Sequence, residues 1–86
     1  MKTATKVRDL EYQKGPKAAF YRLSDRLKGF DYVVVSAVLA AYVHETYIFG
    51  CDENGHVIDW IELPGSTRDV FDHKTVLNKA GYEMLI

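Results

Sequence analysis

The dipeptide Asn54-Gly55, set between two apolar runs, constrains the fold of this chain more than any other feature. Asn-Gly favours the positive backbone angles of a tight hairpin turn. The flanking runs, 46–49 and 56–63, are rich in β-branched and aromatic residues, which favour strands. The sequence therefore predicts two antiparallel strands joined at this turn, with Trp60 close to Tyr47 or Phe49 on the partner strand.

The N-terminal half predicts an arm, a helix and a strand. Residues 1–14 have weak periodicity, so we expect a weakly structured arm or an edge strand. Residues 15–30 carry apolar side chains at helical spacing, and Gly29 lies near the end of this segment. The pattern predicts a basic amphipathic helix with a glycine C-cap. Residues 32–43 lack alternation and contain three consecutive valines, which predicts a strand buried on both faces. We expect it to end at the polar pair His44-Glu45.

The C-terminal part predicts a short helix and a short strand. Asp72 suits the N-cap of a helix over 72–79, and Gly81 suits its C-terminal cap. Residues 82–86 are expected to form a final strand. The predicted fold class is α+β: a three-stranded antiparallel meander plus a short C-terminal strand, covered by an N-terminal and a C-terminal helix. We expect a single domain over 1–86, because 86 residues build one small core.

Charge is divided between two blocks of the chain. Residues 1–30 carry eight Lys/Arg and three Asp/Glu, a balance of +5, whereas residues 31–86 carry three and nine, a balance of −6. Such asymmetry suggests either a basic element that binds an anion or an acidic surface that binds a cationic partner. The candidate anion-binding residues are Lys17, Arg22, Arg26 and Lys28 of the predicted helix. The simpler alternative is that these bases face the acidic sheet of the same chain.

Aromatic residues near the predicted strands are the other candidates for binding. Tyr and Trp are common anchors at protein interfaces, and a small domain cannot bury every aromatic side chain. The candidate partner-binding residues are Tyr42, Tyr47, Trp60 and Arg68. We also expect a homodimer, because a meander leaves open strand edges and a small chain gains from extra burial.

Nothing in the sequence has the spacing of a catalytic or metal site. Asp72-His73, even with Asn78, is explained by helix capping, and adjacency alone does not make an acid–base pair. His44, Glu45, Asp52, Glu53 and His56 lack metal-ligand spacing. The loop 64–68 has two hydroxyls and an Arg but lacks the glycine spacing of a phosphate loop. Cys51 is expected to be a small, partly buried residue rather than a reactive thiol. We therefore expect no enzyme and no cofactor.

The sequence favours a soluble, cytoplasmic protein. No secretory segment follows Met1. The longest apolar run, 32–43, is shorter than the roughly 20 residues of a membrane span. We therefore expect no membrane association.

Residues 31–86 resemble a family of small uncharacterised accessory proteins of tailed bacteriophages. The matching stretches lie at 32–37, 45–49, 52–55, 59–66, 72–73 and 80–83, among them Asp-Trp-Ile-Glu-Leu-Pro-Gly-Ser and Ala-Gly-Tyr-Glu. The resemblance implies a phage product inside a bacterium that binds and modulates a host protein, inhibition of a defence system being one such role. Nucleic-acid or nucleotide binding through the basic residues, and a small hydrolytic enzyme, are the alternative hypotheses.

Overall fold

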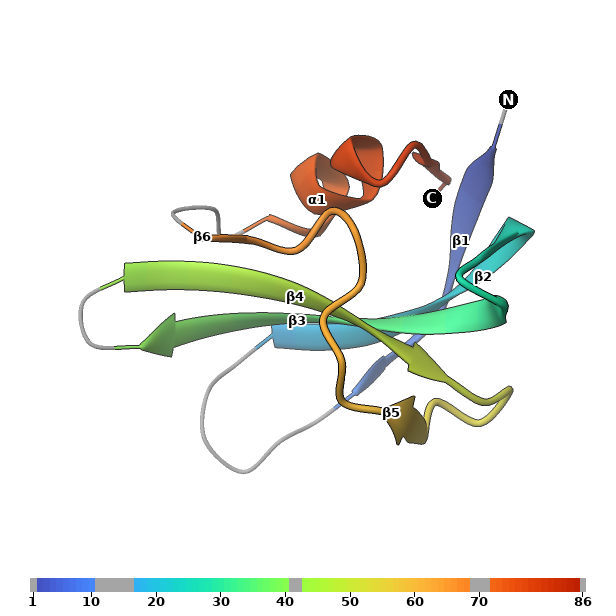
Figure 1. Cartoon of the computed structure of the whole chain (residues 1–86), viewed down its shortest axis with the longest axis horizontal. Coiled ribbons are helices and arrows are strands. Elements are labelled where there is room, and N and C mark those ends of the chain that lie inside the picture. Colours follow the sequence, from blue (N-terminus) through green and yellow to red (C-terminus); the bar gives the residue numbers. More distant parts are fainter. Residues whose placement is uncertain (1, 11–16, 41–42, 69–71, 86) are drawn as a thin grey trace.

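The computed structural model describes residues 2–10, 17–40, 43–68 and 72–85, which form one sheet and one short helix (Figure 1). The elements are β1 (Thr3–Leu10), β2 (Lys17–Leu27), β3 (Phe30–Ala40), β4 (Val43–Cys51), β5 (Val57–Asp59), β6 (Thr67–Arg68), α1 (His73–Lys79) and β7 (Glu83–Leu85). Six strands lie in the order β5-β4-β3-β2-β1-β7, and β6 pairs with β4 on the same edge as β5. Among these described strands, β1 and β7 pair in parallel and the other pairs are antiparallel.

The predicted fold is wrong in its N-terminal half. The segment expected to be a basic helix is β2, so the chain forms a mixed sheet with one helix rather than a three-stranded meander under two. Tyr21 and Leu23 of β2 pack on the face that carries α1, whereas Phe20 packs on the opposite face. Because both faces of this strand are covered, apolar residues follow one another along it and imitate the spacing of a helix.

A two-residue turn ends β2 where the sequence predicted a helix cap. Leu27 pairs with Phe30, and the residues between them, Lys28 and Gly29, have φ angles of 52° and 89°. Two successive positive φ angles define the tight hairpin that suits the twist of antiparallel strands. A glycine in this conformation ends a helix or turns a hairpin equally well, so the Gly29 signal did not distinguish the two.

The hairpin expected at Asn54-Gly55 is confirmed, although its loop is longer than a two-residue turn. β4 and β5 are antiparallel, and Cys51 pairs with Val57 across a five-residue loop. The Asp52 carboxylate accepts the backbone N–H groups of Asn54 at 2.8 Å and His56 at 3.0 Å. Within this loop only Gly55 has a positive φ, 85°.

The boundary between β3 and β4 also differs from the prediction. His44 and Glu45 pair with β3 inside β4, so they are not the break expected between two strands. β3 ends at Ala40 and β4 begins at Val43, and 41–42 lie outside the described residues. Residues 3–10 form β1, and since β7 lies beyond it, β1 is neither a loose arm nor the edge of the sheet.

The C-terminal elements agree with the sequence prediction. Asp72 caps α1 by accepting the Lys74 N–H, and Val76 and Leu77 are buried on its inner side. At the other end Gly81 N–H donates to Asn78 and Tyr82 N–H donates to Leu77, the paired bonds of a Schellman cap. The chain then enters β7, which pairs with β1.

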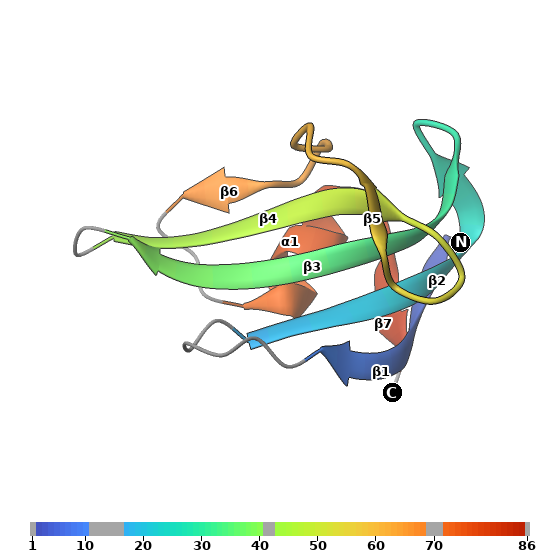
Figure 2. The ribbon, with the colours of Figure 1, turned by 90° about the horizontal axis from the view of Figure 1, so that it is seen from below.

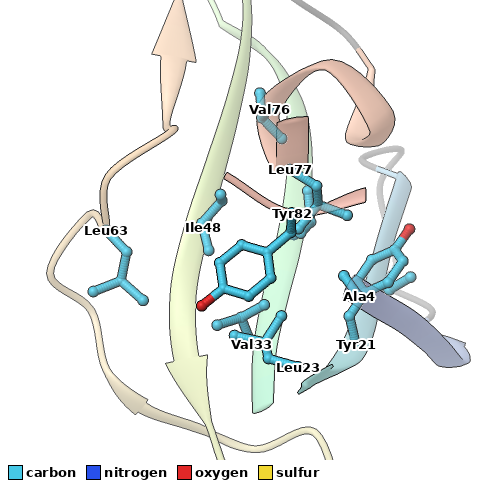
Figure 3. Packing of buried hydrophobic residues seen from close by; sticks show 11 residues of the cluster. Ala4, Tyr21, Leu23, Val33, Ile48, Leu63, Val76, Leu77 and Tyr82 are labelled. Atoms are coloured by element: carbon cyan, nitrogen blue, oxygen red, sulfur yellow. The ribbon is translucent and has the colours of Figure 1, made fainter. Parts of the chain in front are cut away.

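Apolar residues cover both faces of the sheet. On one face α1 and the Tyr82 ring pack against Tyr21, Leu23, Val33 and Ile48 (Figure 3). On the other face, β5 and its flanking loops cross in front of the central strands (Figure 2). There Phe20, Val34 and Cys51 form a smaller cluster with Leu10, Tyr32 and Val57.

The segment after β5 passes around the outer edge of β4. Val57 packs on the face away from α1, whereas Leu63 joins the cluster under α1. The segment forms hydrogen bonds with the backbone of Ile48 in β4. The Ile48 C=O accepts from Leu63 N–H at 2.8 Å, and the Ile48 N–H donates to Ser66 Oγ at 2.9 Å. This passage leaves residues 58–62 on the outside of the molecule.

Candidate functional site

Three aromatic rings line the outer side of β4 and β5. The Tyr47 and Phe49 rings are stacked with centroids 6.0 Å apart, and Trp60 meets Phe49 edge-on at 5.1 Å. Ile58 and Ile61 flank Trp60 in sequence. All three side chains are exposed: Ile58 by 62%, Trp60 by 68% and Ile61 by 66%. We call this group, Tyr47, Phe49, Ile58, Trp60 and Ile61, the β5 surface.

Local backbone geometry explains why these apolar side chains are exposed. The pairing of β4 with β5 shifts register between Gly50 and Cys51, so Ile58 falls in an irregular step of the ladder. β5 ends at Asp59, whose carboxylate accepts the Ile61 N–H at 3.2 Å. This Asx turn directs the backbone out of the strand before Leu63 returns to the core. Residues 60–62 therefore form a projecting turn held at both ends.

The β5 surface lies in a part of the chain without basic residues. No Lys or Arg occurs from 32 to 67, whereas Glu53, Asp59 and Glu62 are exposed around the projecting turn. The described bases of the N-terminal block lie on or next to β1 and β2, beyond β3 in the order of the sheet. Asp59 and Glu62 therefore lie with the apolar turn at the β5 edge of the sheet, whereas Glu83 of the same charge block lies on β7 at the other edge. Arg8 of β1 reaches the loop before β5.

The predicted partner-binding residues fall into two groups. Tyr47 and Trp60 come together through Phe49, which the site prediction had left out. Arg68 lies in β6, in register with Glu45 and so further along the edge of β4. Tyr42 lies outside the described residues. Ile58 and Ile61 were missed because the run 56–63 was interpreted as one strand, in which alternate residues would be buried.

The predicted anion-binding residues are not brought together. Lys17 begins the 11-residue β2 and Lys28 lies in the turn directly after it, and the strand between them is roughly 30 Å long at about 3.3 Å per residue. Arg26 is paired with Asp31 through an Nε–Oδ1 distance of 3.2 Å. Arg22 is exposed and lies opposite Tyr32. These residues form a dispersed basic side rather than one site.

The pair Asp72-His73 has a structural role. The Tyr21 hydroxyl and His73 Nδ1 are 2.9 Å apart, which ties the first residue of α1 to the sheet. Burial, with the nearby charges of Asp9 and Asp72, raises the pKa of Tyr21 to about 12, so this phenol keeps its proton at neutral pH. Asp72 is occupied as the helix cap and Asn78 is exposed at the far end of α1.

The remaining candidate groups are also engaged in the fold. Ser66 Oγ accepts from Ile48 N–H and donates to the Leu63 carbonyl, so the loop 64–68 uses this hydroxyl to close the edge of β4. Burial, with a smaller effect of Asp52, raises the pKa of Cys51 to about 12, which disfavours a reactive thiolate. Among the described residues, no group of three His, Cys, Asp or Glu side chains is placed to hold a metal ion.

Comparison of the chain with protein-family models, curated proteins and solved structures found no match. The resemblance to phage accessory proteins therefore stays a hypothesis. In the part of the chain that the structure describes, no helix has the length and apolar character needed to cross a membrane.

Proposed function

We propose that this chain is a small phage accessory protein that binds and modulates a host bacterial protein through the β5 surface. Inhibition of a bacterial defence system is one form that this modulation takes. The proposal combines the phage resemblance of residues 31–86 with the exposed apolar turn. Binding rather than catalysis is favoured because the His, Tyr and Cys groups described above are buried or serve the fold.

The observation that carries the proposal is that Ile58, Trp60 and Ile61, large apolar residues close together in the chain, are each more than 60% exposed, with Trp60 packed on Phe49. Single exposed apolar residues are ordinary, but a contiguous patch ringed by polar residues is typical of a protein-interaction site. Trp is enriched among the residues that dominate binding energy, because it buries a large area on few rotatable bonds. Phe49 supports Trp60 from below, so the anchor is partly ordered before a partner arrives.

The test is a comparison of three tagged proteins in bacterial lysate treated with nuclease. The wild type should enrich a defined host protein, and the variant Trp60→Ser/Ile61→Ser should lose it. Val7→Ser is the matched control, because Val7 is also an exposed apolar residue but lies on β1. Purified host protein should then bind the wild type and the control with the same affinity. Equal recovery with all three proteins would refute the proposal.

Nucleic-acid binding is the competing outcome. Micromolar binding to DNA or RNA near physiological salt, lost when Lys17, Arg22, Arg26 and Lys28 are changed to Gln, would replace the proposed function. Such binding should fall steeply with salt, because each neutralised phosphate releases counterions. The separation of Lys17 from Lys28 along β2 argues against one compact phosphate site.

A further inference from the structure

We infer that the partner segment seated on the β5 surface is cationic, an extended stretch of another protein whose Arg or Lys side chains contact Trp60 between Asp59 and Glu62. This inference rests on the proposed function and specifies the chemistry of its partner. It assigns the apolar turn and its acidic rim to one recognition site.

Charge complementarity supports a basic partner. Asp59 precedes Trp60 directly, Glu62 follows it by two residues, and both are exposed. Glu53, in the loop before β5, is exposed as well, and Arg8 of β1 reaches this loop, where it donates to the Asn54 carbonyl. The charge argument therefore rests on Asp59 and Glu62, and no Lys or Arg occurs in the sequence from 32 to 67. Acids around an apolar centre attract a basic partner and disfavour an acidic one.

The Trp60 ring adds a second contribution to cation recognition. Trp is the aromatic side chain that binds cations best through its ring face, and Arg is the usual partner. This chain already pairs cations with rings, since Arg8 lies 5.3 Å from the Phe20 centroid and Lys2 lies 5.7 Å from the Tyr82 centroid. Trp60 meets Phe49 edge-on and keeps 68% of its surface exposed. Asp59 and Glu62 are exposed one and two residues from Trp60 in the chain, so they would add to the attraction of a cation bound there.

The same charges argue against a second copy of this chain as the occupant. A two-fold dimer places one surface patch against itself. Such a dimer through the β5 surface would bring Asp59 and Glu62 of one copy to the same acids of the other. Like charges at a desolvated interface are costly, so the occupant should be a protein of opposite charge.

The edge position of β5 suits an extended partner. β5 is the outermost strand at its end of the sheet order, and an edge strand offers unpaired backbone groups to an added strand. Backbone pairing would supply affinity, and alternate side chains would reach Trp60 and its acidic neighbours. An alternating basic and apolar sequence is therefore the appropriate probe.

The experiment uses Trp60 fluorescence, since it is the single tryptophan of the chain. The probe is an end-capped peptide of four Arg-Val repeats, compared with peptides in which Ser or Glu replaces Arg. The basic peptide should bind about tenfold more tightly than the Ser peptide, and raised salt should weaken it. Asp59→Asn/Glu62→Gln should lose most of this preference, because Asn keeps a side-chain oxygen for the Ile61 N–H. Glu83→Gln, at an exposed acid on β7, is the matched control and should bind like the wild type.

The outcomes separate this inference from the proposed function. Equal binding of the basic and Ser peptides, no detectable binding of the basic peptide, or equal loss in the control, overturns the cationic partner. A dimer detected by light scattering and abolished by Trp60→Ser also overturns it, because a second copy would then occupy the surface. If the host protein is still captured through Trp60 and Ile61 in these cases, the proposed function stands without the charge preference.

Discussion

Gly55 and Gly29 share a backbone conformation but differ in what surrounds them. A Cβ added at Gly55 would lie 2.7 Å from Cδ1 of the buried Phe20 ring, whereas one added at Gly29 would meet nothing within 4 Å. Gly55→Ala should therefore lower the free energy of unfolding by about 3 kcal/mol or more, through both strain and a clash with Phe20. Gly29→Ala should cost only about 1–2 kcal/mol, from the left-handed backbone alone. Urea unfolding measures both, and equal losses would contradict the close contact of Gly55 with Phe20.

The buried Cys51 thiol and Tyr21 phenol should make the stability of the fold decrease at alkaline pH. Cys51 and Tyr21 each have a pKa near 12 in the folded chain, above the ordinary values of about 8.5 for Cys and about 10 for Tyr. Because the folded pKa is raised, stability is complete below the unfolded value and is lost as pH rises toward the folded one. The free energy of unfolding should fall by on the order of 2 kcal/mol between pH 8 and about 10.5. In Cys51→Ala the fall should begin nearer pH 10, and an identical profile would contradict the role of the thiol.

At the scale of elements, α1 was predictable and β2 was not. The signals of α1 are local: Asp72 forms its own cap, and Gly81 with Tyr82 closes the other end. The identity of β2 is decided by distant contacts, since Phe20 is covered by the loop at Gly55 and Tyr21 by α1. The site follows the same division. The aromatic residues were visible in the sequence, but the exposure of Ile58 and Ile61 results from the register shift and the Asx turn at Asp59.

The cap of α1 supplies a prediction at this scale. Asp72 accepts from Lys74 N–H and from the Thr75 hydroxyl, and the Thr75 bond is the main cause of its lowered pKa. Asp72→Ala should cost about 1 kcal/mol at pH 7. A lowered folded pKa gives stability that is present above the unfolded value and is lost as pH falls, so the cost should shrink below about pH 4. Unfolding of both proteins at pH 7 and pH 3 checks this, and a cost independent of pH would contradict it.

At the scale of the molecule, the acids around the β5 surface lie at one edge of the sheet, and the described bases of the N-terminal block lie on or next to β1 and β2. The two charge blocks are visible in the sequence, but their positions in space depend on the strand order β5-β4-β3-β2-β1-β7. The segment that carries the candidate anion-binding bases belongs to the sheet itself, and one of them, Arg26, pairs with Asp31 of the acidic block. Lys6 pairs with Asp9, and Arg8 donates to the carbonyl of Asn54. This arrangement leaves the β5 edge suited to a basic partner.

The homodimer expected from the sequence stays a prediction, and the structure suggests which edge would form it. The outer strands are β5 and β6 at one edge and β7 at the other, and the acids around β5 oppose a two-fold contact there. β7 ends the other side of the sheet and exposes 41% of Leu85, so pairing of β7 with its copy is the favoured contact. Light scattering at high micromolar concentration should give twice the 9.8 kDa mass of one chain. Leu85→Lys should shift this mass toward the monomer, because a charge on an edge strand opposes pairing, whereas Trp60→Ser should leave it unchanged. A monomeric wild type would refute the dimer, and a dimer insensitive to Leu85→Lys would place it elsewhere than β7.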